Sequence, residues 1–403
     1  MLLAFLRDAS WLTSRRLRDY ASLLIIVYVL TIGWALTGIG LSDPNGKPIG
    51  TDFVSFWTVS QALHHGAAAA IYHPEKLAML EQAVTGRPDL FYAWSYPPLA
   101  LLIVYPLALL PYLSSLAVWL LVGLALYLTV LWQILPRRLV LWAGLAFPAV
   151  FLTLAHGQNA LLTAGLIGIG LVVLTARPAA AGIAIGLLAF KPQLGILIPL
   201  ALASGGHWRT LLAATLTVAG LAGLSVLFFG GVVWQDFLAA LPFTRSMLEQ
   251  GLVPYYDFQS VFAAARLLGA SLAAAYGAQV IVTFSAAVLV VWAWRLPADQ
   301  GLKNAVLVVA MLIATPFVLD YDLTLLALAI AWLAAAQQHN GALPWERTAL
   351  AAACLMPLCA RVVAARTGIA LTPLIEAVLL FVLWRRCRAA VQAIQPRSAA
   401  ATV

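Results

Sequence analysis

The sequence predicts an all-α protein that crosses a membrane many times, and three features of the chain support this fold class. Hydrophobic residues make up 63% of the 403 residues and charged residues only 9%, whereas a soluble domain carries about 25% charged residues. Apolar runs of about 18 residues or more recur, which is the length that an α-helix needs to cross a bilayer. The basic residues stand in short clusters between these runs, as topology signals do. We therefore expect one integral membrane domain over residues 1–403.

The clearest membrane-spanning segments are the long apolar runs at residues 21–41, 114–135, 211–230, 270–294, 304–318, 323–336, 348–363 and 371–384. Residues 139–204 form a further apolar stretch, which polar groups interrupt at residues 156–159, at Arg177-Pro178 and at Lys191-Pro192-Gln193. This stretch predicts about four more passes, some of them short, so that the expected total is about twelve transmembrane helices.

Two long polar segments separate the apolar runs. The first external loop covers residues 42–112 and contains Asp52 and the pair His64-His65. From Pro97 on, this loop holds an apolar run of about sixteen residues that is broken by Pro106 and Pro111. The run is marginal for spanning and is expected to lie along the membrane surface. The second external segment, residues 232–269, predicts amphipathic helical pieces.

The charge pattern sets the expected orientation in the membrane. A net charge of +8 could suggest nucleic acid as a partner, but the scattered clusters favour topology signals instead, so we expect no nucleic acid. Arginines precede the first span and follow the last, at positions 15, 16, 18, 385, 386 and 388, which predicts that both termini are cytoplasmic. No cleavable signal peptide is expected, because the basic flank leads into a run of full spanning length.

The positive-inside bias also chooses between two topologies. If residues 97–112 cross the membrane, Arg137 and Arg138 fall outside; if they lie along its surface, these and most other basic clusters fall inside. We prefer the second topology, which requires a break at Lys191-Pro192 between two half-helices of about twelve residues each. The outer side then receives most of the unusual polar residues, namely Asp52, His156, Gln158, Asn159, Lys191, Gln193, Asp236, Asp320 and Asp322.

Two charged residues are the strongest candidates for chemistry. Asp52 lies just beyond the first span, beside Phe53, Phe56 and Trp57, and predicts either a reactive carboxylate or an N-cap of the helix that begins at Phe53. Lys191 stands inside an apolar stretch, which is costly unless the cation is paired or wetted. A phosphate partner is favoured there, and a side chain that reaches back to the interface is the alternative.

The other polar groups have structural alternatives too. The histidines at positions 64 and 65 either serve the site or are solvated residues of the loop. Residues 156–159 either bind substrate or form a tight turn at Gly157. Asp320 and Asp322 either serve the site or cap helices after Pro316. The cysteines Cys354, Cys359 and Cys387 show neither a disulfide framework nor a metal-ligand pattern and are expected to pack within helices.

Several short motifs together carry a resemblance to a known family. They are Asp52-Phe53 with Phe56-Trp57, Gly66 and Tyr72, Tyr96-Pro97-Pro98-Leu99, Gly157-Gln158, Lys191-Pro192-Gln193 and Trp208-Arg209. In this order and spacing the chain resembles glycosyltransferase family 87 over nearly its whole length. These membrane enzymes of the GT-C superfamily are typified by α-1,2-mannosyltransferases that use polyprenyl-phosphomannose. The chain lacks the adjacent acidic pair of several other GT-C families, since Asp43, Asp52 and Glu75 are separated.

The resemblance implies an inverting hexosyltransferase in the bacterial cytoplasmic membrane. Its active site would face outward. The enzyme would transfer a sugar, mannose in the typical members, from a polyprenyl-phosphate donor to a glycolipid or glycan acceptor. No cofactor and no metal are expected. The residues themselves support a general base at Asp52 and a cation for the leaving phosphate at Lys191. Further contacts to donor or substrate are expected from His156, Gln158, Asn159, Gln193, Tyr96, Trp57, His65, Tyr321 and Asp322.

Two other classes of protein are compatible with part of this pattern. A lipid-linked sugar flippase or secondary transporter also places polar residues near broken helices, but such folds often contain inverted repeats, and no convincing internal repeat is seen here. A non-enzymatic scaffold of the cell envelope would leave Asp52 and Lys191 without a chemical purpose. The long first external loop followed by an amphipathic second segment favours an interfacial enzyme.

Overall fold

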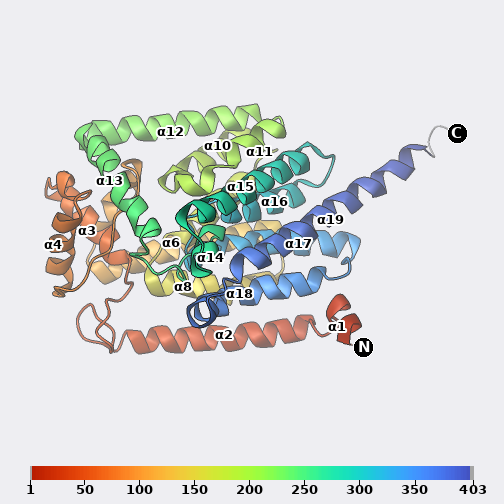
Figure 1. Cartoon of the computed structure of the whole chain (residues 1–403), viewed down its shortest axis with the longest axis horizontal. Helices are drawn as coiled ribbons and strands as arrows, with labels where there is room; N and C mark the ends of the chain where they lie inside the picture. The colour runs from red at the N-terminus through yellow and green to blue at the C-terminus, as the bar shows by residue number, and fades with distance from the viewer. Residues whose placement is uncertain (1, 400–403) are drawn as a thin grey trace.

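The computed structural model describes residues 2–399, and helices account for nearly all of its regular structure. Within these residues β-pairing is confined to two isolated bridges, Ser42 with Pro48 and Phe258 with Leu319. The all-α prediction is therefore confirmed. In Figure 1, α2 and α12 run along opposite edges of the molecule, and the remaining long helices lie between them.

Five helices in the described part of the chain are long and apolar enough to cross a membrane. They are α2 (Ser14–Ala35), α6 (Tyr112–Ile134), α12 (Trp208–Phe229), α15 (Leu272–Arg295) and α18 (Glu346–Thr367). A bent pair, α7 (Arg138–Leu145) and α8 (Pro148–His156), makes a sixth if its two arms, 52° apart, count as one span. The membrane class is thus supported, but the expected total of about twelve is not confirmed.

Shorter apolar helices explain why fewer full spans are found than the sequence predicted. They are α5 with η2 (Leu99–Val104 and Tyr105–Leu109), α9 (Ala160–Val172), α10 with η3 (Pro178–Gly186 and Leu187–Phe190), η4 with α11 (Pro192–Gly195 and Ile198–Ser204) and α16 (Gln300–Ile313). The predicted span 304–318 ends five residues early as a helix, at Ile313. The predicted break at Lys191-Pro192 is confirmed, because η3 ends at Phe190 and η4 begins at Pro192.

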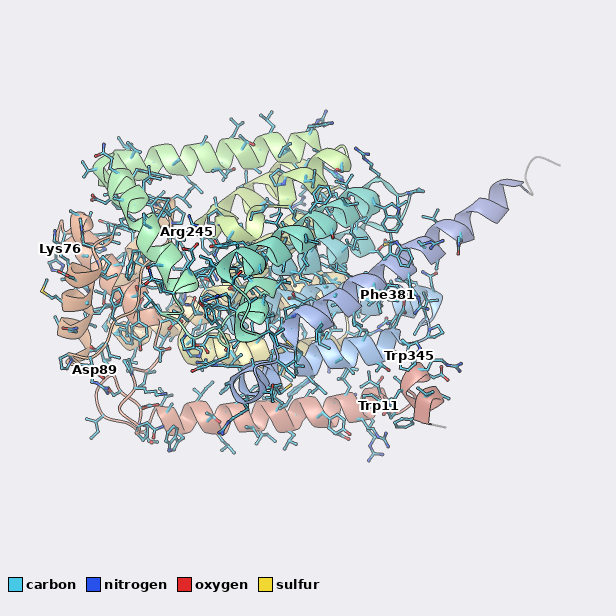
Figure 2. All side chains as sticks on the ribbon, viewed as in Figure 1. Trp11, Lys76, Asp89, Arg245, Trp345 and Phe381 are labelled. Atoms are coloured by element: carbon cyan, nitrogen blue, oxygen red, sulfur yellow. The ribbon has the colours of Figure 1, made fainter. Side chains whose placement is uncertain are left out.

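Residues 42–112, which were predicted as the first external loop, fold into a small layer at one end of the bundle. Its elements are α3 (Phe53–His64), η1 (Ala68–Ala70) and α4 (Pro74–Thr85), followed by the short apolar helices α5 and η2. Pro74 starts α4 and Gly86, with φ +67°, ends it, which matches the usual preference for proline at the first helical position and glycine after the last. α3 and α4 lie together at the end of the molecule opposite α1, where Figure 2 labels Lys76 and Asp89.

Residues 232–269, which were predicted as the second external segment, form helices as expected. These are α13 (Val232–Glu249) and α14 (Val261–Leu267), and the Ser260 hydroxyl caps α14 by accepting a hydrogen bond from Ala263 N. The remaining elements are α1 (Leu2–Asp8), η5 (Asp320–Leu325), α17 (Leu326–Asn340) and α19 (Thr372–Ala399).

Close helix packing in the bundle depends on small residues. On α10, Gly182 and Gly186 are four residues apart and both face α12, a small-xxx-small arrangement that lets two backbones approach. A Cβ added at Gly182 would clash with Thr210 O and lie 2.5 Å from Ala213 Cβ. Gly220, on α12 itself, has nothing within 4 Å of such a Cβ.

We therefore predict that Gly182→Ala destabilises the protein, because one extra methyl group must push α10 and α12 apart. Overpacking of this kind costs about 1–3 kcal/mol, so thermal unfolding in detergent should shift down by roughly 2–4 °C or more. Gly220→Ala is the matched control and should leave the midpoint unchanged or raise it slightly, since alanine favours helix. Equal midpoints for the two variants would contradict the close contact.

Candidate active site

A cavity of about 540 Å³ lies between the layer formed by residues 42–112, α13 and η5. It brings together residues that are more than 300 positions apart in the sequence. Its polar lining consists of Asp52, Ser55, Tyr92, Ser95, Tyr96, His156, Gln158, Lys191, Gln193, Thr244, Asp257, Asp320, Tyr321, Asp322 and Arg361. The apolar lining includes Phe56, Phe91, Phe190, Phe237, Leu241, Met247, Val253, Phe258 and Phe317.

Asp52 stands at the cap position of α3, but its side chain does not cap that helix. Its backbone has helical angles, φ −72° and ψ −19°, and no side-chain hydrogen bond to the first turn is formed. Instead, its Oδ2 accepts a hydrogen bond of 2.8 Å from Gln158 Nε2, and its backbone N–H donates to His156 O at 3.0 Å. The capping alternative is therefore not what the side chain does, and the carboxylate faces the cavity.

Residues 156–159 form the tight turn between α8 and α9 that the sequence offered as an alternative to substrate binding. Gly157 has φ +65°, and a Cβ there would lie 2.6 Å from Phe53 Cβ, so the turn fits against the start of α3. The imidazole Nδ1 of His156 is 2.8 Å from the Thr51 hydroxyl. The turn therefore lies directly behind Asp52, and His156 and Gln158 reach the cavity as well.

Lys191 finds its partner inside the protein. Its Nζ donates to Asp322 Oδ1 at 2.5 Å, and both side chains are almost completely buried, with 3% and 4% exposed. The ammonium group also lies 5.1 Å from the centre of the Tyr321 ring, a cation–π arrangement. The alternative, in which the Lys191 side chain reaches back to the membrane interface, is thereby excluded. Asp322 Oδ2 additionally accepts from Leu319 N, which is the capping role predicted as its alternative.

A second charged group occupies another part of the lining. Arg361 on α18 has its Nε 2.6 Å from Asp257 Oδ1 and its Nη1 3.6 Å from Asp320 Oδ2. The loop that carries Asp257 is held beside η5, because Gln259 N donates to Val318 O at 2.8 Å. Burial raises the pKa of Asp257, and the nearby Arg361 charge opposes part of that shift.

Three of the predicted contact residues do not line this cavity. Trp57 donates its indole N–H to Leu110 O at 3.1 Å and packs against Tyr112, because it lies on another face of α3 from Ser55 and Phe56. His65 follows the far end of α3, with its Nδ1 2.8 Å from Gln61 O. Asn159 is buried and lies one layer behind, where its Nδ2 donates to the Tyr96 hydroxyl at 2.9 Å.

Comparison with family models decides the family of this chain. Residues 94–319, more than half of the sequence, match the model described as glycosyltransferase family 87. The chain belongs to glycosyltransferase family 87. It is accordingly a membrane glycosyltransferase. Searches of curated proteins and of solved structures found no match.

The part of the chain that matches the glycosyltransferase family 87 model holds some of the cavity residues but not all. Tyr96, His156, Gln158, Lys191 and Asp257 fall within residues 94–319. The polar lining residues outside it are Asp52, Ser55, Tyr92, Asp320, Tyr321, Asp322 and Arg361. Asp52 joins the matched part through its hydrogen bond with Gln158, so the fold makes one site from both parts.

Several residues of this glycosyltransferase were not predicted from the sequence, among them Arg361 in the cavity lining and the buried Glu81 outside it. Arg361 gave a signal, because it is a charged residue near the end of the predicted span 348–363. Glu81 gave none, since it stands in an ordinary amphipathic helix. It is nevertheless fully buried; its Oε2 accepts from Tyr92 N at 2.7 Å, and its Oε1 has no hydrogen-bond partner among the described residues.

Burial raises the pKa of Glu81 to about 8, and the charge of Asp52 adds to this shift. A carboxyl group whose folded-state pKa is raised stabilises the fold fully below its ordinary value of 4.5, and this stabilisation is lost as the pH rises through about 8. Above that pH the folded protein must hold a buried, poorly compensated charge.

We predict that Glu81→Gln removes this pH dependence. Glutamine keeps the acceptor for Tyr92 N but cannot ionise, so the variant should match the wild type near pH 5 and exceed its unfolding midpoint near pH 9. Thermal unfolding in detergent across this range measures the difference. The matched control is Glu75→Gln on the exposed side of α4, which should follow the wild-type curve. Parallel curves for Glu81→Gln and the wild type would refute the assignment.

Proposed function

We propose that this member of glycosyltransferase family 87 moves a hexose, mannose in the first instance, from a polyprenyl-phosphate donor to a hydroxyl of a glycolipid or glycan. The reaction would take place at the outer face of the bacterial cytoplasmic membrane. The observation that carries the proposal is the Asp52 carboxylate in a cavity that also holds the Lys191 ammonium group and a wall of apolar side chains.

Asp52 is the general base in this proposal. Its Oδ2 is engaged by Gln158, whereas no protein donor to Oδ1 is found among the described residues. The acceptor oxygen forms a bond to the anomeric carbon, its proton passes to Asp52 Oδ1, and the bond from the anomeric carbon to the phosphate oxygen breaks. With one carboxylate and direct attack, the configuration at the anomeric carbon inverts, by analogy with glycoside hydrolysis, where retention needs a nucleophilic carboxylate.

Lys191 is the proposed partner of the departing phosphate. An ammonium group carries three donors, and Asp322 uses one of them, so the other two remain for phosphate oxygens. A cation whose side chain is buried and held in place stabilises developing negative charge without reorganising during the reaction. Tyr96, His156, Gln193 and Tyr321 line the same cavity and are the proposed contacts to the sugars.

The apolar wall is the proposed path of the isoprenoid chain. α13 contributes Phe237, Leu241 and Met247 to the cavity lining, and Phe91 and Val253 extend that surface. α13 also exposes large apolar side chains, among them Leu238. A lipid chain that enters along α13 would reach the cavity without leaving an apolar surface.

Asp52→Asn tests the proposal most directly. Purified wild-type protein should transfer the sugar from a synthetic polyprenyl-phosphomannose to a mannoside acceptor, and Asp52→Asn should reduce kcat by about 10²–10⁴-fold, the usual contribution of a general base. Turnover is measured by the appearance of the extended glycoside.

Asp236→Asn on α13 is the matched control, because it removes a carboxylate outside the cavity lining. It should keep wild-type kcat. Retention of more than roughly a tenth of the wild-type rate by Asp52→Asn would contradict the role of base. Absence of transfer by the wild type from any polyprenyl-phosphate hexose would overturn the proposed function itself.

We further predict that transfer survives EDTA. The residues that the structure describes include no group of three or more histidine, cysteine or carboxylate side chains suited to a metal ion, and the proposed donor carries a single phosphate. The rate after incubation with excess EDTA should equal the untreated rate. Loss of transfer that Mg²⁺ or Mn²⁺ restores would reject a metal-independent mechanism and indicate a pyrophosphate-linked or nucleotide-type donor.

A further inference from the structure

The structure assigns to Gln158 the role of a positioning residue that holds the Asp52 carboxylate in one orientation, in place of the substrate contact that the sequence suggested. This inference rests on the proposed role of Asp52 as the general base. It gives the turn between α8 and α9 a task in the reaction, although Gln158 itself does not touch the reacting atoms.

Hydrogen bonds on both ends of the side-chain amide support this role. Gln158 Nε2 donates to Asp52 Oδ2 at 2.8 Å. Its Oε1 accepts from the backbone N–H of Asn159 at 3.2 Å and faces the Tyr96 hydroxyl at 3.5 Å. Asn159 Nδ2 in turn donates to that hydroxyl at 2.9 Å, which leaves the Tyr96 proton free to point toward Gln158.

The donors around Oε1 determine which way the amide points. Oxygen and nitrogen of a glutamine amide are distinguished by their partners, and here the backbone N–H of Asn159 can only donate. The acceptor end of the amide must therefore face Asn159, and the donor end must face Asp52. A reversed amide would place two donors together on one side and two acceptors on the other.

The backbone adds a second attachment to the same turn. Asp52 N donates to His156 O at 3.0 Å, and Gly157 adopts a left-handed conformation with no room for a Cβ against Phe53. Gln158 and Asn159 are themselves only 6% and 3% exposed. Because both the main chain and the side chain of Asp52 are tied to one buried turn, the carboxylate has little freedom to rotate.

The consequence concerns the oxygen that Gln158 leaves open. With Oδ2 engaged, Oδ1 is the atom that takes the acceptor proton, and its direction is fixed before the acceptor arrives. Correct placement of a catalytic group is worth much of an enzyme's rate, and a displacement of about 1 Å can cost about 10²-fold. Gln158 should therefore influence the chemical step and leave ground-state binding nearly unchanged.

Gln158→Leu and Gln158→Glu test the inference with steady-state kinetics. The leucine variant removes the donor, so kcat should fall by about 30- to 100-fold, with KM for donor and acceptor within about threefold of wild type. The glutamate variant sets a second carboxyl group against Asp52 and should lose at least as much. Gln235→Leu, an exposed glutamine on α13 outside the cavity, is the matched control and should keep wild-type kinetics.

The outcomes separate the possible roles of Gln158. A rise in KM at unchanged kcat would overturn the inference and restore the substrate-binding role. Unchanged kcat and KM in the leucine variant would overturn it too. Thermal unfolding of each variant in detergent shows whether the folded fraction accounts for a lower rate, and kcat is expressed per folded protein.

A double-mutant cycle with Asp52→Asn shows whether Gln158 acts through Asp52. If it does, Gln158→Leu should lower the residual transfer of Asp52→Asn by less than about twofold, because there is no longer a base to orient. A full 30-fold further loss in that background would contradict the inference. Failure of the proposed function has a different signature: Asp52→Asn would then keep its activity, or the wild type would have none.

Discussion

The buried ion pair between Lys191 and Asp322 is the interaction on which the rest of the site depends. Each charge alone would be expensive in this apolar interior, and removing one partner of such a pair typically costs about 3–5 kcal/mol. The pair joins the break between η3 and η4 to η5, across 131 residues of sequence. It therefore fixes where the half-helices meet η5, just beyond the end of the family-model match, and both of its side chains line the cavity.

The cavity exists because the layer formed by residues 42–112 and the helix bundle are held together at several points. The start of α3 rests on the turn at Gly157, and the loop with Asp257 is attached to Val318 just before η5. Phe56 and Phe190 belong to one hydrophobic cluster and Phe258 to another, and all three line the cavity. The site is thus a junction between separately packed units, the kind of place where ligand pockets commonly form.

Composition and periodicity predicted what depends on single segments. The membrane class, the break at Lys191 and the helical second external segment all follow from local sequence. The number of full spans does not follow from local sequence, because an apolar run of about fifteen residues is equally compatible with a short membrane pass and with a half-helix. The partner of Lys191 was also out of reach, since a single sequence does not say that residue 322 packs against residue 191. Trp57 was misplaced for the same reason: its face of α3 is set by tertiary contacts with Leu110 and Tyr112.

Asp52 shows that contacts within the site can override the usual preference of aspartate for capping a helix. Aspartate before an apolar helix normally caps it, with extended backbone angles and a side chain turned to the first free N–H groups. Here the backbone at Asp52 is already helical and the carboxylate turns away to Gln158, so the first turn of α3 forgoes a side-chain cap worth roughly 1 kcal/mol. Departures of this kind concentrate at functional sites, where the fold accepts a local cost that other contacts offset. At this position the first N–H groups of α3, those of Phe53 and Val54, donate instead to the backbone oxygens of Gly50 and Thr51, and the carboxylate stays available for chemistry.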